Sequence, residues 1–145
     1  MSSKGLEVID HTVQLTHEWI NEMTERLDWS EPKQALRLMR VTLHELRDRL
    51  PVEEVAQLSA QLPLLIRGMF FEGWSPGKDN KPSRSVDAFV ASIEMKVGNV
   101  AEYRGVEDIE EVFRLLENRI SWGETKDIRA ILPSTLRTLW SQADS

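Results

Sequence analysis

A histidine and an aspartate lie four residues apart in the segment His44-Glu45-Leu46-Arg47-Asp48. On a helix these two side chains would share a face, and such a pair can hold a metal ion when further ligands complete the site. The other histidines, His11 and His17, supply no apparent third ligand. The helical pattern also places His44 and Asp48 in solvent, opposite the apolar stripe. We therefore predict a solvated pair of side chains and no metal site.

The chain lacks the other residue patterns of catalysis that we considered. It has no cysteine, which excludes thiolate metal sites, disulfides and cysteine nucleophiles. It has neither a Gly-x-Ser-x-Gly elbow nor a glycine-rich phosphate loop. Four acids, Glu107, Asp108, Glu110 and Glu111, cluster at an expected helix start, where negative charge favours the helix macrodipole. That role is structural, so we predict a protein that is not an enzyme and that uses no cofactor.

Two leucine–proline pairs, each followed by an arginine, form a more specific candidate: Leu62-Pro63 with Arg67, and Leu132-Pro133 with Arg137. A proline at a helix start leaves the N–H groups of the first turn free, and the arginine adds positive charge about one turn away. The two arginines could form a paired anion site. Alternatively, each arginine ties its helix to an acid of a neighbouring helix, with its stem packed on the core. The acids in question would be Glu54 and Glu124. We favour this second, structural interpretation.

Trp74 is the other candidate binding residue, because it is a large aromatic in a stretch rich in glycine and proline. Such a residue either packs on the core as a plug or contacts a partner, and we favour the plug. The same stretch is weakly basic through Lys78, Lys81 and Arg84. Three charges without a ladder of aromatic residues do not predict nucleic-acid binding.

The helices that position these residues follow from the spacing of apolar side chains. A seven-residue period through Leu6, Val13, Ile20 and Leu27 predicts a helix from about Ser3 to Leu27. This stripe faces either the protein's own core, which we favour, or a second copy of the chain. Further helices are expected at about 30–50, 52–60, 63–71, 86–97, 106–120, 121–130 and 133–140, with Ser30 and Ser121 as N-caps and Gly98 as a C-cap.

The two halves of the chain align without a gap at a shift of 70 residues. Leu62-Pro63 falls on Leu132-Pro133, Arg67 on Arg137, and Glu54 on Glu124. We therefore predict an all-α fold, a bundle of about eight helices built from two tandem repeats. Residues 1–72 form the first repeat with an amino-terminal extension, 73–85 a linker, and 86–145 the second repeat. Repeats of this kind bury their apolar faces against each other, so one compact unit is expected.

Composition sets the broad class. The chain has 145 residues and a net charge of −6, which argues against nucleic-acid or anionic-membrane partners. The longest apolar run, 62–71, is interrupted by Pro63, Arg67 and Gly68, so no transmembrane helix is expected. No secretory signal is visible at the amino terminus. We expect a cytoplasmic protein.

The block from Gln61-Leu-Pro through Arg67-Gly to Glu72-Gly-Trp74 resembles a bacterial family of unknown function, DUF2267. The segments Asp127–Pro133 and Arg137–Trp140 resemble the recurring ending of the same family. The resemblance implies an all-helical, bacterial, intracellular protein and carries no known activity or site residues. The second repeat departs from the pattern, with isoleucine in place of glutamine at 131 and threonine in place of glycine at 138. Any property of that glutamine or glycine therefore belongs to the first repeat.

These observations favour a non-enzymatic protein-interaction module. Its partner would be a second copy of the chain or another protein, bound through the amino-terminal stripe or a patch around Phe70, Phe71 and Trp74. The alternative is a sensor that binds a small ligand or anion in a pocket between the repeats, near Arg67 and Arg137. The sequence identifies neither the partner nor the ligand.

Overall fold

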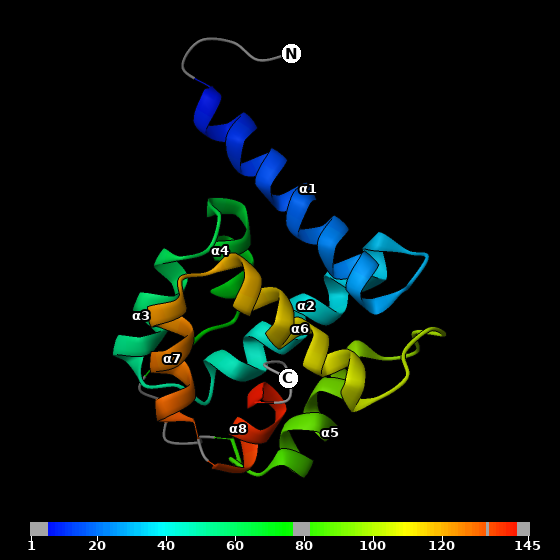
Figure 1. Cartoon of the computed structure of the whole chain (residues 1–145), viewed down its shortest axis with the longest axis vertical. Helices are drawn as coiled ribbons and strands as arrows, with labels where there is room; N and C mark the ends of the chain where they lie inside the picture. The colour runs from blue at the N-terminus through cyan, green and yellow to red at the C-terminus, as the bar shows by residue number, and fades with distance from the viewer. Residues whose placement is uncertain (1–5, 77–81, 133, 142–145) are drawn as a thin grey trace.

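The computed structural model describes residues 6–76, 82–132 and 134–141, and within them every regular element is a helix (Figure 1). The eight helices are α1 (Glu7–Leu27), α2 (Pro32–Arg47), α3 (Val52–Ala60), α4 (Leu64–Phe70), α5 (Val86–Val97), α6 (Val106–Arg119), α7 (Trp122–Ile131) and α8 (Ser134–Ser141). The predicted all-α bundle is confirmed. Pro133, Lys78 and Lys81, which entered the sequence argument, lie outside the described residues.

The first helix of each half packs on the second helix of the other half. α1 lies against α2 and α6, while α2 also lies against α5 and α6. α3 and α7 lie side by side at one edge of the molecule (Figure 1). α3 and α7 begin at Val52 and Trp122, and α4 and α8 begin at Leu64 and Ser134, so both pairs keep the 70-residue spacing. The repeat and its boundaries stay a prediction, but two pairs of helices in matching positions, α2 with α6 and α3 with α7, contact each other.

One core joins both halves. Phe89 of α5 stacks on Phe113 of α6 with ring centroids 6.2 Å apart, and Phe113 contacts Trp140 of α8 at 4.9 Å. Trp19 of α1 is buried in the same cluster. Aromatic side chains of this size contribute a large share of the apolar area removed from water. None of the described helices is long and apolar enough to cross a membrane.

Helix ends follow the local signals where no distant residue interferes. Ser121 caps α7 by accepting a hydrogen bond from the Glu124 amide, and Gly98 ends α5 with φ of 75°. Ser30, by contrast, is not the cap of α2, because Glu31 holds that position. The amide and hydroxyl of Ser30 instead donate to the carboxylate of Glu102 at 2.9 and 3.0 Å.

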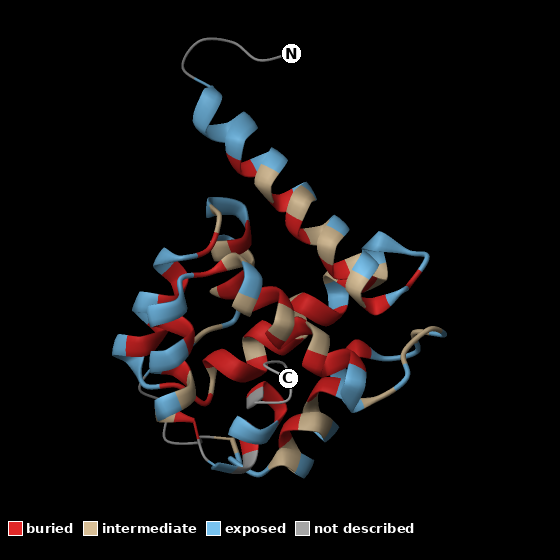
Figure 2. Cartoon of the chain, viewed as in Figure 1, coloured by how far each residue is buried: buried red, intermediate tan, exposed pale blue. Residues whose placement is uncertain are grey.

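The apolar stripe of α1 is only partly buried, which corrects the interpretation that it faces the core throughout. The buried face is formed by Thr12, Thr16, Trp19, Met23 and Leu27. Leu6, Ile9 and Val13 are 50%, 53% and 40% exposed. The physical reason is visible in Figures 1 and 2: the first turns of α1 project beyond the body, so no other described helix lies beneath them.

Candidate functional site

Arg67 and Arg137 occupy matching positions on α4 and α8 and make matching contacts. Arg67 donates from Nε to the Ser59 carbonyl at 2.8 Å and from Nη2 to the Leu62 carbonyl at 3.2 Å. Arg137 donates from Nη2 to the Leu132 carbonyl at 2.9 Å. The acceptors are therefore carbonyls at helix ends rather than the acids we expected. Both guanidinium groups brace the turn before their own helix, and these contacts give no support to a paired anion site.

Trp74 lies half-buried against the core. Its ring centroid is 5.2 Å from that of Phe71, which in turn meets Phe70 edge-on at 5.3 Å. Phe70 is fully buried. The predicted patch around these aromatics is thus largely covered by its own packing, and the arrangement is that of a plug.

His44 is not in solvent, which corrects the expectation for the His44–Asp48 pair. Its Nε2 lies 2.5 Å from the carbonyl oxygen of Met69 and donates to it, and the carboxylate of Glu72 is 3.9 Å away. The imidazole therefore ties α2 to the end of α4. Across the described residues, no group of three or more histidine, aspartate or glutamate side chains is arranged to hold a metal ion.

Two buried glutamates meet where α3 lies beside α7. Glu54 and Glu124 are 5% and 7% exposed. The Oε2 atom of each is buried and has no hydrogen-bond partner among the residues that the structure describes. Burial raises the pKa of Glu124 to about 8, and the hydrogen bond and charge of Glu54 and the charge of Asp127 add to this rise. The α3–α7 contact therefore holds two carboxyl groups in one poorly solvated space.

One end of the α3–α7 contact is closed by a hydrogen bond from the Ser121 amide to Gln61 Oε1 at 3.1 Å. Glu124 therefore does not complete a capping box with that amide, and its side chain turns inward instead. Gln61 is the residue that the second half replaces with Ile131. The matching bond is accordingly absent at the other end of the contact, between the described residues Ile131 and Pro51, because Pro51 has no amide hydrogen to donate and the Ile131 side chain has no acceptor.

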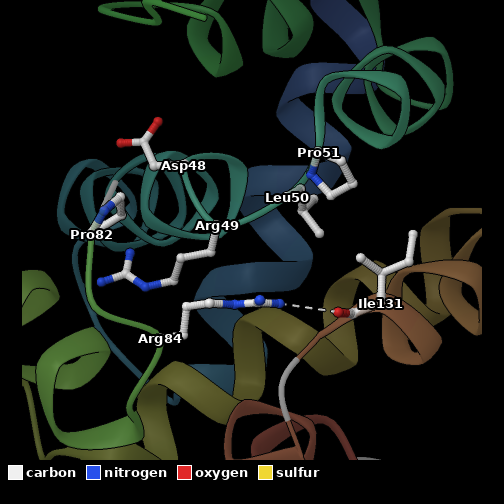
Figure 3. Close-up of a pocket in the computed structure, with 7 residues that line it drawn as sticks. All are labelled: Asp48, Arg49, Leu50, Pro51, Pro82, Arg84 and Ile131. Atoms are coloured by element: carbon white, nitrogen blue, oxygen red, sulfur yellow. Dashed lines mark hydrogen bonds between the residues drawn. The ribbon is translucent and has the colours of Figure 1, made fainter. Parts of the chain in front are cut away.

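That other end opens into a pocket of about 380 Å³ (Figure 3). Residues of both halves line it: Asp48, Arg49, Leu50, Pro51, Pro82, Arg84 and Ile131. Arg84 reaches across the pocket and donates to the Ile131 carbonyl at 3.3 Å. The pocket lies between the halves, as the sensor hypothesis requires, but its arginines are Arg49 and Arg84 rather than Arg67 and Arg137.

Arg49 belongs to a buried ionic cluster behind this pocket. Its Nη1 donates to Glu45 Oε1 at 3.0 Å, its Nε donates to the Ser83 carbonyl at 2.9 Å, and its guanidinium lies 5.1 Å from the centre of the Phe89 ring. Lys96 also donates to the Glu45 carboxylate. Burial alone would raise the pKa of Glu45, but the hydrogen bonds from Lys96, Ser92 and Arg49 lower it below its ordinary value. The cluster fastens α5 to α2 with a fully compensated carboxylate.

An exposed apolar surface is the second candidate, and we call it the α1 patch. It comprises Leu6, the N-cap of α1, with Val8, Ile9 and Val13 of α1 and Leu64 and Leu65 of α4, all at least 40% exposed. The Leu65 amide donates to Thr12 Oγ1 at 2.9 Å, which fixes α4 against α1 where the helix leaves the body. No charged side chain belongs to the patch. Scattered exposed apolar residues are ordinary, but Leu6, Ile9 and Val13 lie on one face of the helix, and exposed apolar side chains gathered in this way are typical of interaction surfaces.

Comparison with known proteins identifies the family. The model of a family described as "Uncharacterized conserved protein (DUF2267)" matches residues 16–139. The chain belongs to this family. Membership in DUF2267 confirms the resemblance read from the Gln61–Trp74 block, and the description assigns no activity. No curated protein is significantly similar to the chain. The family match begins at Thr16, so the projecting first turns of α1 lie outside the matched residues.

Sequence reasoning placed Glu54 on Glu124 but did not anticipate that they would meet. The signal was the predicted repeat: if two such halves packed about a twofold axis, equivalent residues near that axis would meet. The pocket arginines Arg49 and Arg84 were missed because Arg84 lies in the connection between the halves, where no periodic pattern predicts its position.

Proposed function

We propose that this member of DUF2267 is a protein-interaction module that forms a homodimer through the α1 patch. The observation that supports it is the uncovered apolar face of the first turns of α1, where Leu6, Ile9 and Val13 are at least 40% exposed. The proposed partner surface is the same patch on a second copy of the chain.

The uncovered face continues the buried one. Successive helix residues are 100° apart, so Ile9 lies in line with Thr16 and Met23, which are buried. The row that is buried at Met23 and Thr16 thus continues to an exposed apolar side chain at Ile9. A second helix laid along this row would extend the bundle packing by two turns, at about 25 cal/mol for each Å² of apolar area removed from water.

The composition of the patch favours a second copy over a charged partner. Leu6, Ile9 and Val13 follow the three-and-four spacing at which helices pair with one another. In a twofold interface each copy presents the same surface, so an uncharged row meets an uncharged row without repulsion. The exposed acids Glu7 and Asp10 lie toward the flank of the helix and stay in solvent.

Sedimentation velocity over a range of protein concentrations tests the proposal. We expect a monomer–dimer equilibrium that Ile9→Glu shifts to monomer while the helical circular dichroism is retained. Met95→Glu is the matched control, because Met95 is 81% exposed on α5 and lies outside the patch. A strictly monomeric wild-type protein, or a dimer that Ile9→Glu leaves intact, would contradict the proposal.

A second candidate function, a sensor for a small anionic ligand, is favoured by the pocket between the halves. Arg49 and Arg84 line it beside the apolar side chains of Leu50 and Ile131. A ligand there would contact both halves at once and so stabilise their association. Thermal-shift measurements with inorganic phosphate and with simple carboxylates test this idea. A rise in melting temperature that Arg84→Ala removes would support it, and no rise with any of them would count against it.

A further inference from the structure

The glutamates of the α3–α7 contact lack the usual compensation for buried charge. A buried carboxylate is ordinarily paired with a cation or with several donors, because desolvation disfavours its charged form. Glu54 and Glu124 instead face each other, and each retains one buried oxygen without a hydrogen-bond partner among the described residues. Two carboxylates this close cannot both ionise without strong repulsion.

The charged groups on the surrounding helices do not relieve this pair. On α7, Asp127 adds negative charge, Lys126 lies 5.1 Å from the Trp122 ring centre, and Arg129 is 3.5 Å from Glu117. On α4, Arg67 donates to carbonyls, as described above. On α3 itself the only other ionisable group is Glu53, which is exposed. The charged groups of α6, the remaining helix packed on α7, are Glu107, Asp108, Glu110, Glu111, Arg114, Glu117 and Arg119.

The cations of α6 have acids of their own. Arg119 donates from Nε to Glu22 Oε1 at 2.6 Å, and Arg114 donates to Glu111 at 2.8 Å. Asp108 receives three hydrogen bonds from Arg104. The remaining charged groups of α6 are acidic, so α6 supplies no cation to compensate the pair.

We propose that Glu54 and Glu124 share one proton and act as a latch, which holds α3 against α7 while the proton is bound and loosens that contact when both carboxyls are ionised. The contact lies between the two halves of the chain, so the latch sets how firmly the halves are joined at this edge. Pro51 and Ile131 lie at the same contact and line the pocket. Loosening α3 from α7 would therefore also widen the pocket on that side.

The proton shared by Glu54 and Glu124 determines how the stability of the fold changes with pH. The raised pKa of Glu124, about 8 against an ordinary 4.5, means that the folded chain holds a proton that the unfolded chain has already released. Stability from this pair is complete below pH 4.5 and falls as the pH rises, until it is lost above about pH 8. Because the two groups titrate together, the proton belongs to the pair rather than to either residue.

The melting temperature across this pH window tests the latch. We expect the wild-type value to fall as the pH rises from 4.5 to above 8, and Glu124→Gln to remove most of that fall, because glutamine has the same shape and never ionises. Glu54→Gln should behave in the same way. Glu53→Gln is the matched control, since it neutralises an exposed carboxylate on the same helix and should keep the wild-type slope. The same dependence of melting temperature on pH in the wild type and all three glutamine variants would overturn the proposal.

A measurement on the wild-type chain keeps the proposal testable if a glutamine variant does not fold. Carbon-13 NMR of the side-chain carboxyls should show that the Glu54–Glu124 pair takes up its shared proton far above the ordinary range of glutamate. Hydrogen exchange, corrected for the intrinsic pH dependence, should show that α3 and α7 lose protection over the same range while α5 does not. Ordinary titration of both glutamates, or unchanged protection in α3 and α7, would contradict the latch.

Discussion

Glu54 and Glu124 face each other across the α3–α7 contact, although they lie 70 residues apart in the chain. Each belongs to the first turn of its helix, and each is more than nine-tenths buried. Equivalent residues of the two halves therefore form one contact, and its charge state depends on both halves at once. Glu45 shows the contrasting arrangement, because that buried carboxylate is paired with the cations Arg49 and Lys96.

Lys96→Met should make the protein more sensitive to acid. Lys96 and Arg49 hold the Glu45 carboxylate in its charged form, and the lowered pKa of Glu45 means that this stability is present above pH 4.5 and is lost as the pH falls below it. Without Lys96, acid unfolding followed by circular dichroism should begin at higher pH, with a loss of about 1 kcal/mol at neutral pH because Lys96 is itself half-exposed. Lys126→Met, which leaves Glu45 untouched, serves as control. An unchanged acid midpoint would contradict this account of the cluster.

Arg67→Ala should destabilise the protein more than Arg137→Ala does. Arg67 is half-buried and donates from Nε and Nη2 to carbonyls around the α3–α4 turn. Arg137 donates to the Leu132 carbonyl of the α7–α8 turn but is exposed, so water can replace its contacts more easily. We expect a loss of about 1–2 kcal/mol for Arg67→Ala in urea unfolding, since buried carbonyls would lose their donor. Phosphate should not change the ranking. If both variants kept wild-type stability but lost a stabilising effect of phosphate, the paired anion site would be the better interpretation.

Trp74→Ala should lower stability and leave self-association unchanged. The indole packs on Phe71 at the edge of the core, so its removal costs about 2 kcal/mol, less than for a fully buried aromatic. Urea unfolding measures the loss, and sedimentation velocity measures the dimer. A stable Trp74→Ala variant that no longer associates would show that Trp74 contacts a partner and is not a plug.

Local chemistry made some features readable from sequence. Ser121 and Gly98 cap α7 and α5 as predicted, because a capping hydroxyl and a glycine with positive φ need only the neighbouring backbone. Ser30 has the same cap chemistry but lies within reach of Glu102 from the other half, and that distant carboxylate takes its hydrogen bonds. The local sequence around Ser30 could not predict this, because Glu102 is 72 residues away in the chain.

Periodicity likewise shows which face of a helix is apolar and not what lies beneath it. Ile9 and Met23 are apolar residues of the same helical row, yet Met23 is buried and Ile9 is 53% exposed. The difference depends on where the body ends, which is a property of the whole fold. Arg67 shows the same limit of sequence-based prediction. Its length and charge predicted an ion pair with an acid of a neighbouring helix, but it donates to carbonyls of the turn before α4.

The most direct test of the proposed homodimer uses the absence of cysteine from the chain. Ile9→Cys places a single thiol in the middle of the α1 patch, where two copies paired along this row bring position 9 close to its own equivalent. Under mild oxidation the account predicts a disulfide-linked dimer on non-reducing gels, whereas Met95→Cys, at a position that is more exposed but outside the patch, stays monomeric. Equal and slow cross-linking of both variants would contradict the claim that the α1 patch joins two copies of this protein.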